Sequence, residues 1–197
     1  MSEYELYNRI LAPRLKPKNQ NVLIEKTAKK AHVAEIISDK HTSYTLYRYD
    51  QKEFGELFFP FFNNTHDGEN GSAESPAPED LLKFCDYILL AERKGVLFVL
   101  LIEMKSGENG DACKQLDASE TFMEYIKASA ARVSAANGYA HFDAVNVIVR
   151  KIVLKPAPKA RPMTNVAKSK QHDVDINASP IYFQQANLPL YLFCKNK

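Results

Sequence analysis

The chain has 197 residues, of which 45% are hydrophobic and 25% are charged, and its formal net charge is +2. This size fits one domain, and the composition is typical of a soluble globular protein. No apolar run reaches the ~20 residues that a membrane-spanning helix needs, and the acidic N-terminus is unlike a signal peptide. We therefore expect a single domain over 1–197 in the cytoplasm, with no membrane contact.

The first quarter of the chain is predicted to contain two helices and a strand. A short helix begins near Tyr4 and is closed by Pro13 and Pro17. Apolar residues near helical spacing, with lysines on the other side, predict a second helix over 22–38. The β-branched and aromatic residues of 43–50 predict a strand.

Residues 54–80 are predicted to be irregular. The first part, 54–62, is strongly aromatic but interrupted by Pro60, which favours a buried segment without regular structure. Residues 63–80 are rich in Gly, Pro, Asn and Ser and have almost no apolar side chains. This composition predicts a flexible surface loop just upstream of the residues considered below.

The middle of the chain predicts a β-hairpin followed by a long helix. Two apolar runs, 84–91 and 96–104, are joined by the turn-like residues 92–95. Residues 111–137 carry apolar side chains at helical spacing, and Gly138 is a suitable C-terminal stop.

The last part predicts a strand over 143–154, a basic loop at about 155–172, and a short strand over 188–194. The coarse order is then helix, strand, hairpin, long helix and strand. That order predicts an α/β fold, with a mixed β-sheet flanked by helices.

Three polar residues interrupt the apolar hairpin strands. Asp86 lies in the first run, and Glu103 and Lys105 end the second. A carboxylate in a buried strand is strongly penalised unless a cation or a hydrogen-bond network compensates it. The sequence therefore predicts either a salt bridge or a metal site at these positions.

The hairpin register decides whether the three residues meet. If Arg93 and Lys94 are the two turn residues, Asp86 lies opposite Leu101. Side chains alternate along a strand, so Glu103 and Lys105 share the face of Asp86. Glu103 is then a diagonal neighbour of Asp86, on the order of 7 Å away. At that distance two carboxylates can converge on one divalent cation.

Oxygen ligands favour Mg²⁺ or Mn²⁺ over zinc. Such a metal polarises a phosphodiester and activates water, and an adjacent lysine orients that water or neutralises charge on the phosphate. The carbonyl of Met104, between the two key side chains, is a candidate third ligand. The predicted metal ligands are thus Asp86, Glu103 and Met104.

An Asp, an apolar hairpin ending in Ile-Glu-Met-Lys, and a helix starting near Lys114-Gln115 together resemble the PD-(D/E)xK nuclease superfamily. The resemblance covers about 84–154. It implies a restriction-endonuclease-like core in which Asp86 and Glu103 bind metal and Lys105 assists catalysis. In several branches of that family a glutamine early in the helix also lines the site, and Gln115 matches it.

The chain also departs from the family pattern. Cys85 occupies the place of the proline that precedes the aspartate in the family motif. Many members carry an acidic residue on the first helix, for which Glu35 is the first candidate here and Glu25 the second.

Residues 144–172 contain no Asp or Glu but many basic side chains. A stretch of this kind can follow a phosphate backbone, although it can equally be a solvated loop. The candidate nucleic-acid-binding residues are Arg150, Lys151, Lys155, Lys159, Arg161, Lys168 and Lys170.

The remaining chemistry-bearing residues favour structural roles. Three separated cysteines exclude a disulfide framework, and no histidine lies at a metal-binding spacing from any of them. Nothing in the sequence matches a phosphate-binding glycine loop or a serine-hydrolase motif. Glu103 and Lys105 also admit a plainer interpretation, as strand-end surface residues paired with neighbours.

We therefore expect a Mg²⁺-dependent nuclease, an endonuclease rather than an exonuclease, acting on DNA in a prokaryotic defence or restriction setting. A homodimer or a partner protein would supply specificity. The alternative is a catalytically inactive module of the same fold that binds nucleic acid or a protein partner, because fold alone does not establish function.

Overall fold

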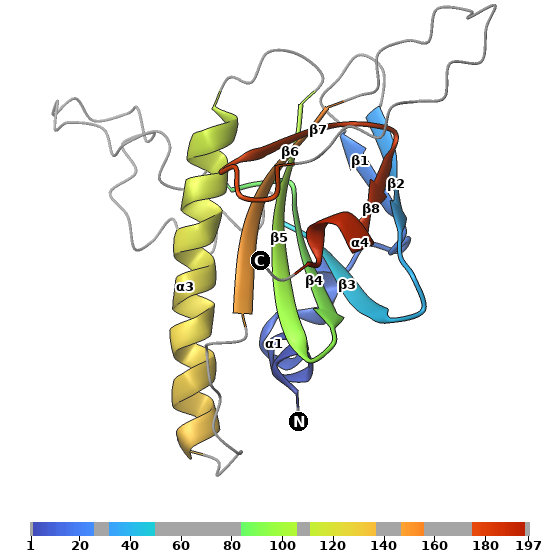
Figure 1. Ribbon diagram of the computed structural model, residues 1–197. Coiled ribbons are helices and arrows are strands. Elements are labelled where there is room, and N and C mark those ends of the chain that lie inside the picture. Colours follow the sequence, from blue (N-terminus) through green and yellow to red (C-terminus); the bar gives the residue numbers. More distant parts are fainter. Residues whose placement is uncertain are drawn as a thin grey trace, which may run out of the picture.

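The computed structural model of the chain has an α/β fold built on two β-sheets (Figure 1). The structure describes residues 2–25, 32–49, 84–105, 111–136, 147–155 and 175–195. The aromatic segment 54–62, the predicted loop 63–80 and most of the basic loop 155–172 lie outside these ranges. Within the described part of the chain, no helix is long and apolar enough to cross a membrane.

The larger sheet has five strands in the order β3-β4-β5-β6-β7. They are β3 (Thr42–Arg48), β4 (Tyr87–Arg93), β5 (Val96–Met104), β6 (Val147–Lys155) and β7 (Ile181–Gln184). Neighbours from β3 to β5 are antiparallel, whereas β6 and β7 run parallel to β5. The predicted strands over 43–50 and 143–154 are confirmed as β3 and β6, and β7 was not predicted.

The smaller sheet has the order β1-β2-β8, formed by β1 (Val22–Glu25), β2 (His32–Ile37) and β8 (Asn187–Pro189). The helix predicted over 22–38 is therefore wrong. Burial along both β1 and β2 alternates with a period of two, so Leu23, Ala34 and Ile36 are buried and their neighbours face outward. Several residues here are β-branched, and antiparallel pairing overrides a helical spacing that was only approximate.

Helices cover the larger sheet, as predicted. Helix α1 (Glu3–Ile10) begins with a capping box in which Ser2 and Glu5 bond each other's backbone, and a 3-10 turn at Pro13–Leu15 follows it. The long helix is confirmed as α3 (Ala112–Ala136). At the C-terminus only β8 is extended. The rest of the predicted strand over 188–194 is wrong, because Leu190–Phe193 form the short helix α4.

The five-stranded sheet has a hydrophobic core on each face. Its odd-numbered β5 residues and its even-numbered β4 residues pack with α1 and α3, and the others pack with the small sheet and α4. Figure 1 shows α3 and the small sheet on opposite sides of this sheet. Strand β5 is thus covered on both faces, which explains its nearly continuous apolar sequence.

The β4–β5 hairpin has a two-residue turn with positive φ at both positions, 53° at Lys94 and 74° at Gly95. Arg93 pairs with Val96, so the register differs by two residues from the prediction that Arg93 and Lys94 form the turn. The reason is that Gly95 adopts a positive φ readily, as this hairpin turn requires. A shift of two residues keeps every side chain on its predicted face.

Candidate active site

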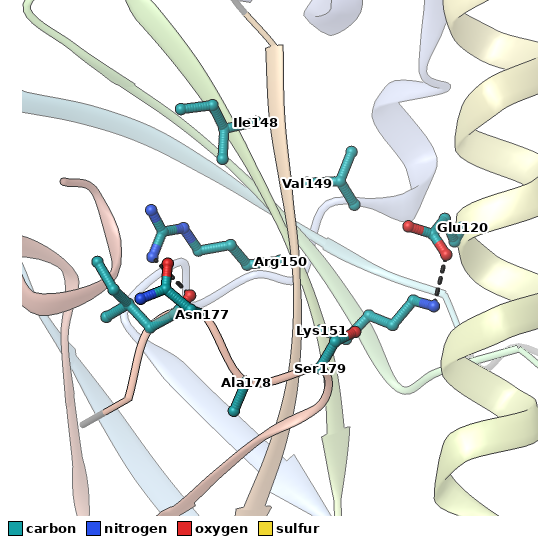
Figure 2. A pocket seen from close by; sticks show the side chains of 9 residues that line it. Glu120, Ile148, Val149, Arg150, Lys151, Asn177, Ala178 and Ser179 are labelled. Atoms are coloured by element: carbon teal, nitrogen blue, oxygen red, sulfur yellow. Dashed lines mark hydrogen bonds and ion pairs between the residues drawn. The ribbon is translucent and has the colours of Figure 1, made fainter. Parts of the chain in front are cut away.

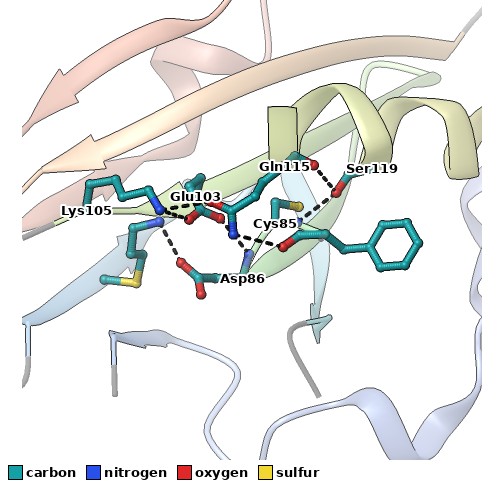
Figure 3. Close-up of polar contacts among 8 residues, drawn as sticks. Cys85, Asp86, Glu103, Lys105, Gln115 and Ser119 are labelled. Atoms are coloured by element: carbon teal, nitrogen blue, oxygen red, sulfur yellow. Dashed lines mark hydrogen bonds and ion pairs between the residues drawn. The ribbon is translucent and has the colours of Figure 1, made fainter. Parts of the chain in front are cut away.

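Asp86, Glu103 and Lys105 meet at one end of the five-stranded sheet (Figure 3). Asp86 immediately precedes β4, Glu103 lies near the carboxyl end of β5, and Lys105 follows that strand. Gln115, from the first turns of α3, approaches the same point. The structure therefore brings together all four of the side chains predicted to be catalytic.

Asp86 and Glu103 are directly opposite each other rather than diagonal, since the register observed for the hairpin continues by one residue to this pair. A reciprocal clasp holds them. The Asp86 backbone N–H donates to Glu103 Oε2 at 3.2 Å, and the Met104 N–H donates to Asp86 Oδ2 at 2.7 Å. Each carboxylate is thus fixed by the other strand's main chain.

Glu103 is only 2% exposed, which is unusual for a carboxylate. Burial, followed by the negative charge of Asp86, raises the pKa of Glu103 to about 7, against opposing effects of Lys105 and of the Asp86 N–H. Two nearby carboxylates with one ammonium leave a net negative charge at the site. Such an environment favours a bound cation or a bound proton.

Lys105 links the strand to the helix. Its Nζ lies 2.7 Å from Glu103 Oε1 and 2.9 Å from Gln115 Oε1. The Gln115 side chain also donates to the Phe84 carbonyl at 3.5 Å. The ammonium group is therefore fixed from two sides, an arrangement that fits both a catalytic lysine and the plainer interpretation of strand-end residues paired with neighbours.

Ser119 supports this arrangement from one helical turn further along α3. Its hydroxyl accepts a hydrogen bond from the Cys85 N–H and donates to the Gln115 carbonyl, both at 2.8 Å. Cys85 is fully buried, and burial raises the pKa of its thiol to about 12, so it acts as a small apolar residue. Ser119 was not among the residues predicted from the sequence, although a serine on the apolar face of a helix was an available signal.

The donor set fits a hard divalent cation. Among the described residues no group of three or more His, Cys, Asp or Glu side chains gathers in one place, so a cation here needs a main-chain or water oxygen as well. The N–H and C=O of a strand residue point to the same neighbouring strand. Because the Met104 N–H binds Asp86, the Met104 carbonyl also faces that side.

The two candidates for a further acidic residue lie in the small sheet. Glu35 is exposed in β2, where it pairs with Val22 of β1 and Asn187 of β8. Glu25 is buried at the end of β1, next to Ile24, whose N–H and C=O both bond the Tyr87 hydroxyl. The Tyr87 side chain packs with the small sheet, on the face opposite to Asp86 and Glu103, so this contact does not bring Glu25 to the two carboxylates.

Arg150 is directed away from solvent and into the protein. Its guanidinium donates to the carbonyls of Ile176 and Lys195 and lies 5.8 Å from the centre of the Phe98 ring. These contacts give Arg150 a structural role, as it ties β6 to the C-terminal segment.

Lys151 forms ion pairs with Asp117 and Glu120 of α3 and so ties the helix to β6 (Figure 2). A cavity of about 370 Å³ lies beside it, between β6 and residues 176–179. Lys155, at the carboxyl end of β6, is half-buried, as Lys151 is. The other predicted nucleic-acid-binding residues, Lys159, Arg161, Lys168 and Lys170, lie outside the described residues.

The arrangement joins two carboxylates, a fixed ammonium and a main-chain carbonyl at one end of the five-stranded sheet. Chemically, it is suited to holding a metal ion beside an anionic group. Comparisons of the chain with family models, with curated proteins and with solved structures found no match.

Proposed function

We propose that this protein is a metal-dependent nuclease of the PD-(D/E)xK type, with a restriction-endonuclease-like core. The observation that carries the proposal is the pairing of Asp86 with a buried Glu103, with the Lys105 ammonium 2.7 Å from that glutamate. The expected substrate is DNA, cut internally, in a prokaryotic defence or restriction setting.

The order of elements supports the same proposal. A helix, a strand, a hairpin, a long helix and a strand occur in this order as α1, β3, β4–β5, α3 and β6 around one mixed sheet, with β1 and β2 of the small sheet inserted between α1 and β3. This is the coarse order predicted from the sequence pattern, except that the first helix is α1, since 22–25 and 32–37 form strands. The catalytic side chains come from a strand end, which is a rigid support for chemistry.

Asp86, Glu103 and the Met104 carbonyl would hold Mg²⁺ or Mn²⁺. When bound, such an ion supplies Lewis-acid charge for the phosphate and lowers the pKa of a water. The chain's own contribution comes from position: the main-chain clasp fixes both carboxylates before substrate arrives. Preorganised charge of this kind requires little rearrangement during the reaction.

Lys105 would act on the phosphate or on the attacking water. An ammonium group has three N–H donors. Two of them are directed at Glu103 and Gln115, which leaves the third for a phosphate oxygen or a water. Gln115 acts as a positioning residue, since it orients the ammonium from the helix.

The test is cleavage of plasmid and single-stranded DNA with Mg²⁺ or Mn²⁺ by the wild type and by Lys105→Ala. We expect metal-dependent cutting, lowered at least about 100-fold in the variant, as is usual when a charge-stabilising group is removed. Lys127→Ala removes a half-buried lysine of α3 that is paired with Glu124; it is the matched control and should cut normally. Undiminished cutting by Lys105→Ala would contradict the proposed site.

One observation favours the alternative of an inactive binding module. Both Glu103 oxygens already accept hydrogen bonds, one from the Asp86 N–H and one from the Lys105 ammonium. The cluster is therefore compensated within the protein, as a purely structural buried ion pair would be. Binding of DNA without cutting under either metal, by folded protein, would favour this alternative.

A further inference from the structure

Side chains from four adjacent segments form a row across the α3 face of the sheet at the site. Glu103 pairs with Val153 of β6, and Val153 pairs with Tyr182 of β7. Asp86 precedes Tyr87, the partner of Ile102, and so begins the same row. Because paired residues on neighbouring strands face the same way, Tyr182 lies on the face of the two carboxylates.

A second row, parallel to the first, is formed by Lys105, Lys155 and Gln184. The Lys105 N–H donates to the Leu154 carbonyl at 3.0 Å and thus continues the β5–β6 ladder, and Lys155 pairs with Gln184. These residues lie two positions beyond the first row, so they share its face. Val153, in the middle of the first row, is fully buried with side chains of α3, whereas Lys105 and Lys155 are half-buried and Gln184 is exposed. The second row therefore provides the accessible course from the carboxylates to β7, the edge strand of the sheet.

Tyr182 is 50% exposed at the end of the first row. Its hydroxyl lies 3.9 Å from Cys113 Sγ in the first turn of α3, so the residue borders the helix that carries Gln115. An exposed ring beside cationic side chains is the combination by which proteins bind single strands, since bases stack on the ring and lysines contact phosphates.

We propose that a single-stranded nucleic-acid segment leaves the Asp86–Glu103 site along the second row and passes Tyr182, the exposed end of the first row. Lys155 contacts a phosphate, Gln184 lines the path, and a base stacks on Tyr182. The proposal rests on the nuclease function only for the position of the phosphate that is cut. It deepens that function by naming the substrate class.

The spacing suits a base close to the cut. Two strand separations, or about 10 Å, lie between Glu103 and Tyr182. At about 3.4 Å of rise per nucleotide, this corresponds to roughly three nucleotides, and to fewer in an extended strand. Stacking on Tyr182 needs an unpaired base, because neighbouring bases cover the faces of a paired one.

The experiment measures the binding of a fluorescent oligothymidylate of about 12 nucleotides, and of a duplex of equal length, by anisotropy in EDTA. Tyr182→Ala is expected to weaken single-strand binding about tenfold, and Tyr182→Phe, which keeps the ring, should bind like the wild type. The control Tyr125→Ala removes a tyrosine of α3 that is 66% exposed and remote from the rows. It should have no effect.

Lys155→Gln supplies an independent measurement. It should weaken binding of the same oligonucleotide and reduce the slope of log affinity against log salt concentration by about 0.7, the value for one phosphate contact on a single strand. Both Tyr182 and Lys155 are partly exposed, so neither variant is expected to unfold the protein.

Equal binding by Tyr182→Ala and Tyr125→Ala, absence of single-strand binding, or duplex binding as tight as single-strand binding would each overturn the proposal. Because no metal is present, the result is separate from cleavage. Tyr182-dependent binding without cutting would support the proposed single-strand path and contradict the proposed nuclease function. Cutting of DNA together with unchanged single-strand binding by Tyr182→Ala would support the nuclease function and contradict the proposed path.

Discussion

Glu103 is the residue at which the competing forces are clearest. Burial and the charge of Asp86 raise its pKa from 4.5 to about 7, so the folded protein holds a proton that the unfolded chain releases at lower pH. Folding stability must therefore fall as pH rises from about 5 to 7, and this contribution levels off above 7. The free-energy cost of keeping Glu103 ionised therefore falls at the position proposed for the metal.

We predict that, in metal-free buffer, the free energy of unfolding of the wild type declines between pH 5 and pH 7 more steeply than that of Glu103→Gln. Glutamine removes the titrating group and keeps the shape of the side chain. Denaturant titrations of both proteins at several pH values measure the difference. Parallel pH profiles would contradict the charge balance described for the site.

Ser119 provides a second prediction at the residue scale. Ser119→Ala leaves the buried Cys85 N–H without its acceptor, and we expect a loss of about 1–3 kcal/mol in the free energy of unfolding. Thr121→Ala is the matched control, because that hydroxyl bonds a carbonyl four residues back at an exposed position. A similar small loss for both variants would contradict a supporting role for Ser119.

At the scale of elements, the β4–β5 hairpin positions the site. Sequence patterning predicted both strands and the shared face of Asp86, Glu103 and Lys105, because alternation follows from the strand itself. The pattern placed the turn one residue too early, at Arg93–Lys94, whereas the residues with positive φ are Lys94 and Gly95. Which two residues form the turn decides whether Asp86 and Glu103 lie directly or diagonally opposite each other. The face of the sheet that each side chain occupies was thus predictable, whereas the direct apposition of the two carboxylates was not.

We expect Lys94→Asn to raise the free energy of unfolding by up to about 1 kcal/mol, since asparagine tolerates the positive φ of 53° better than lysine does. Gly95→Ala should lower it by about 1 kcal/mol, because φ is 74° there although nothing lies within 4 Å of the added methyl group. Thermal denaturation of both variants measures whether each change in stability has the expected direction. Stabilisation by Gly95→Ala would contradict a positive φ at this turn position.

At the scale of the whole molecule, local patterns predicted the elements that are buried on one or both faces, such as α3, β5 and β6. They failed for β1 and β2, where short apolar runs fit a helix and a strand almost equally well. The small sheet joins β8 to β2, with more than a hundred residues between them in sequence. No local pattern carries information about such a pairing, which tertiary packing determines.

The most direct test of this account is a calorimetric titration of the metal-free wild type with Mn²⁺ at pH 8, beside Asp86→Asn and Glu103→Gln. We predict one binding event in the wild type, weakened at least about tenfold in either variant, because two carboxylates share one cation. The wild type should also melt at a higher temperature with Mn²⁺ than without it. Equal Mn²⁺ binding by all three proteins, or none by the wild type, would contradict the account.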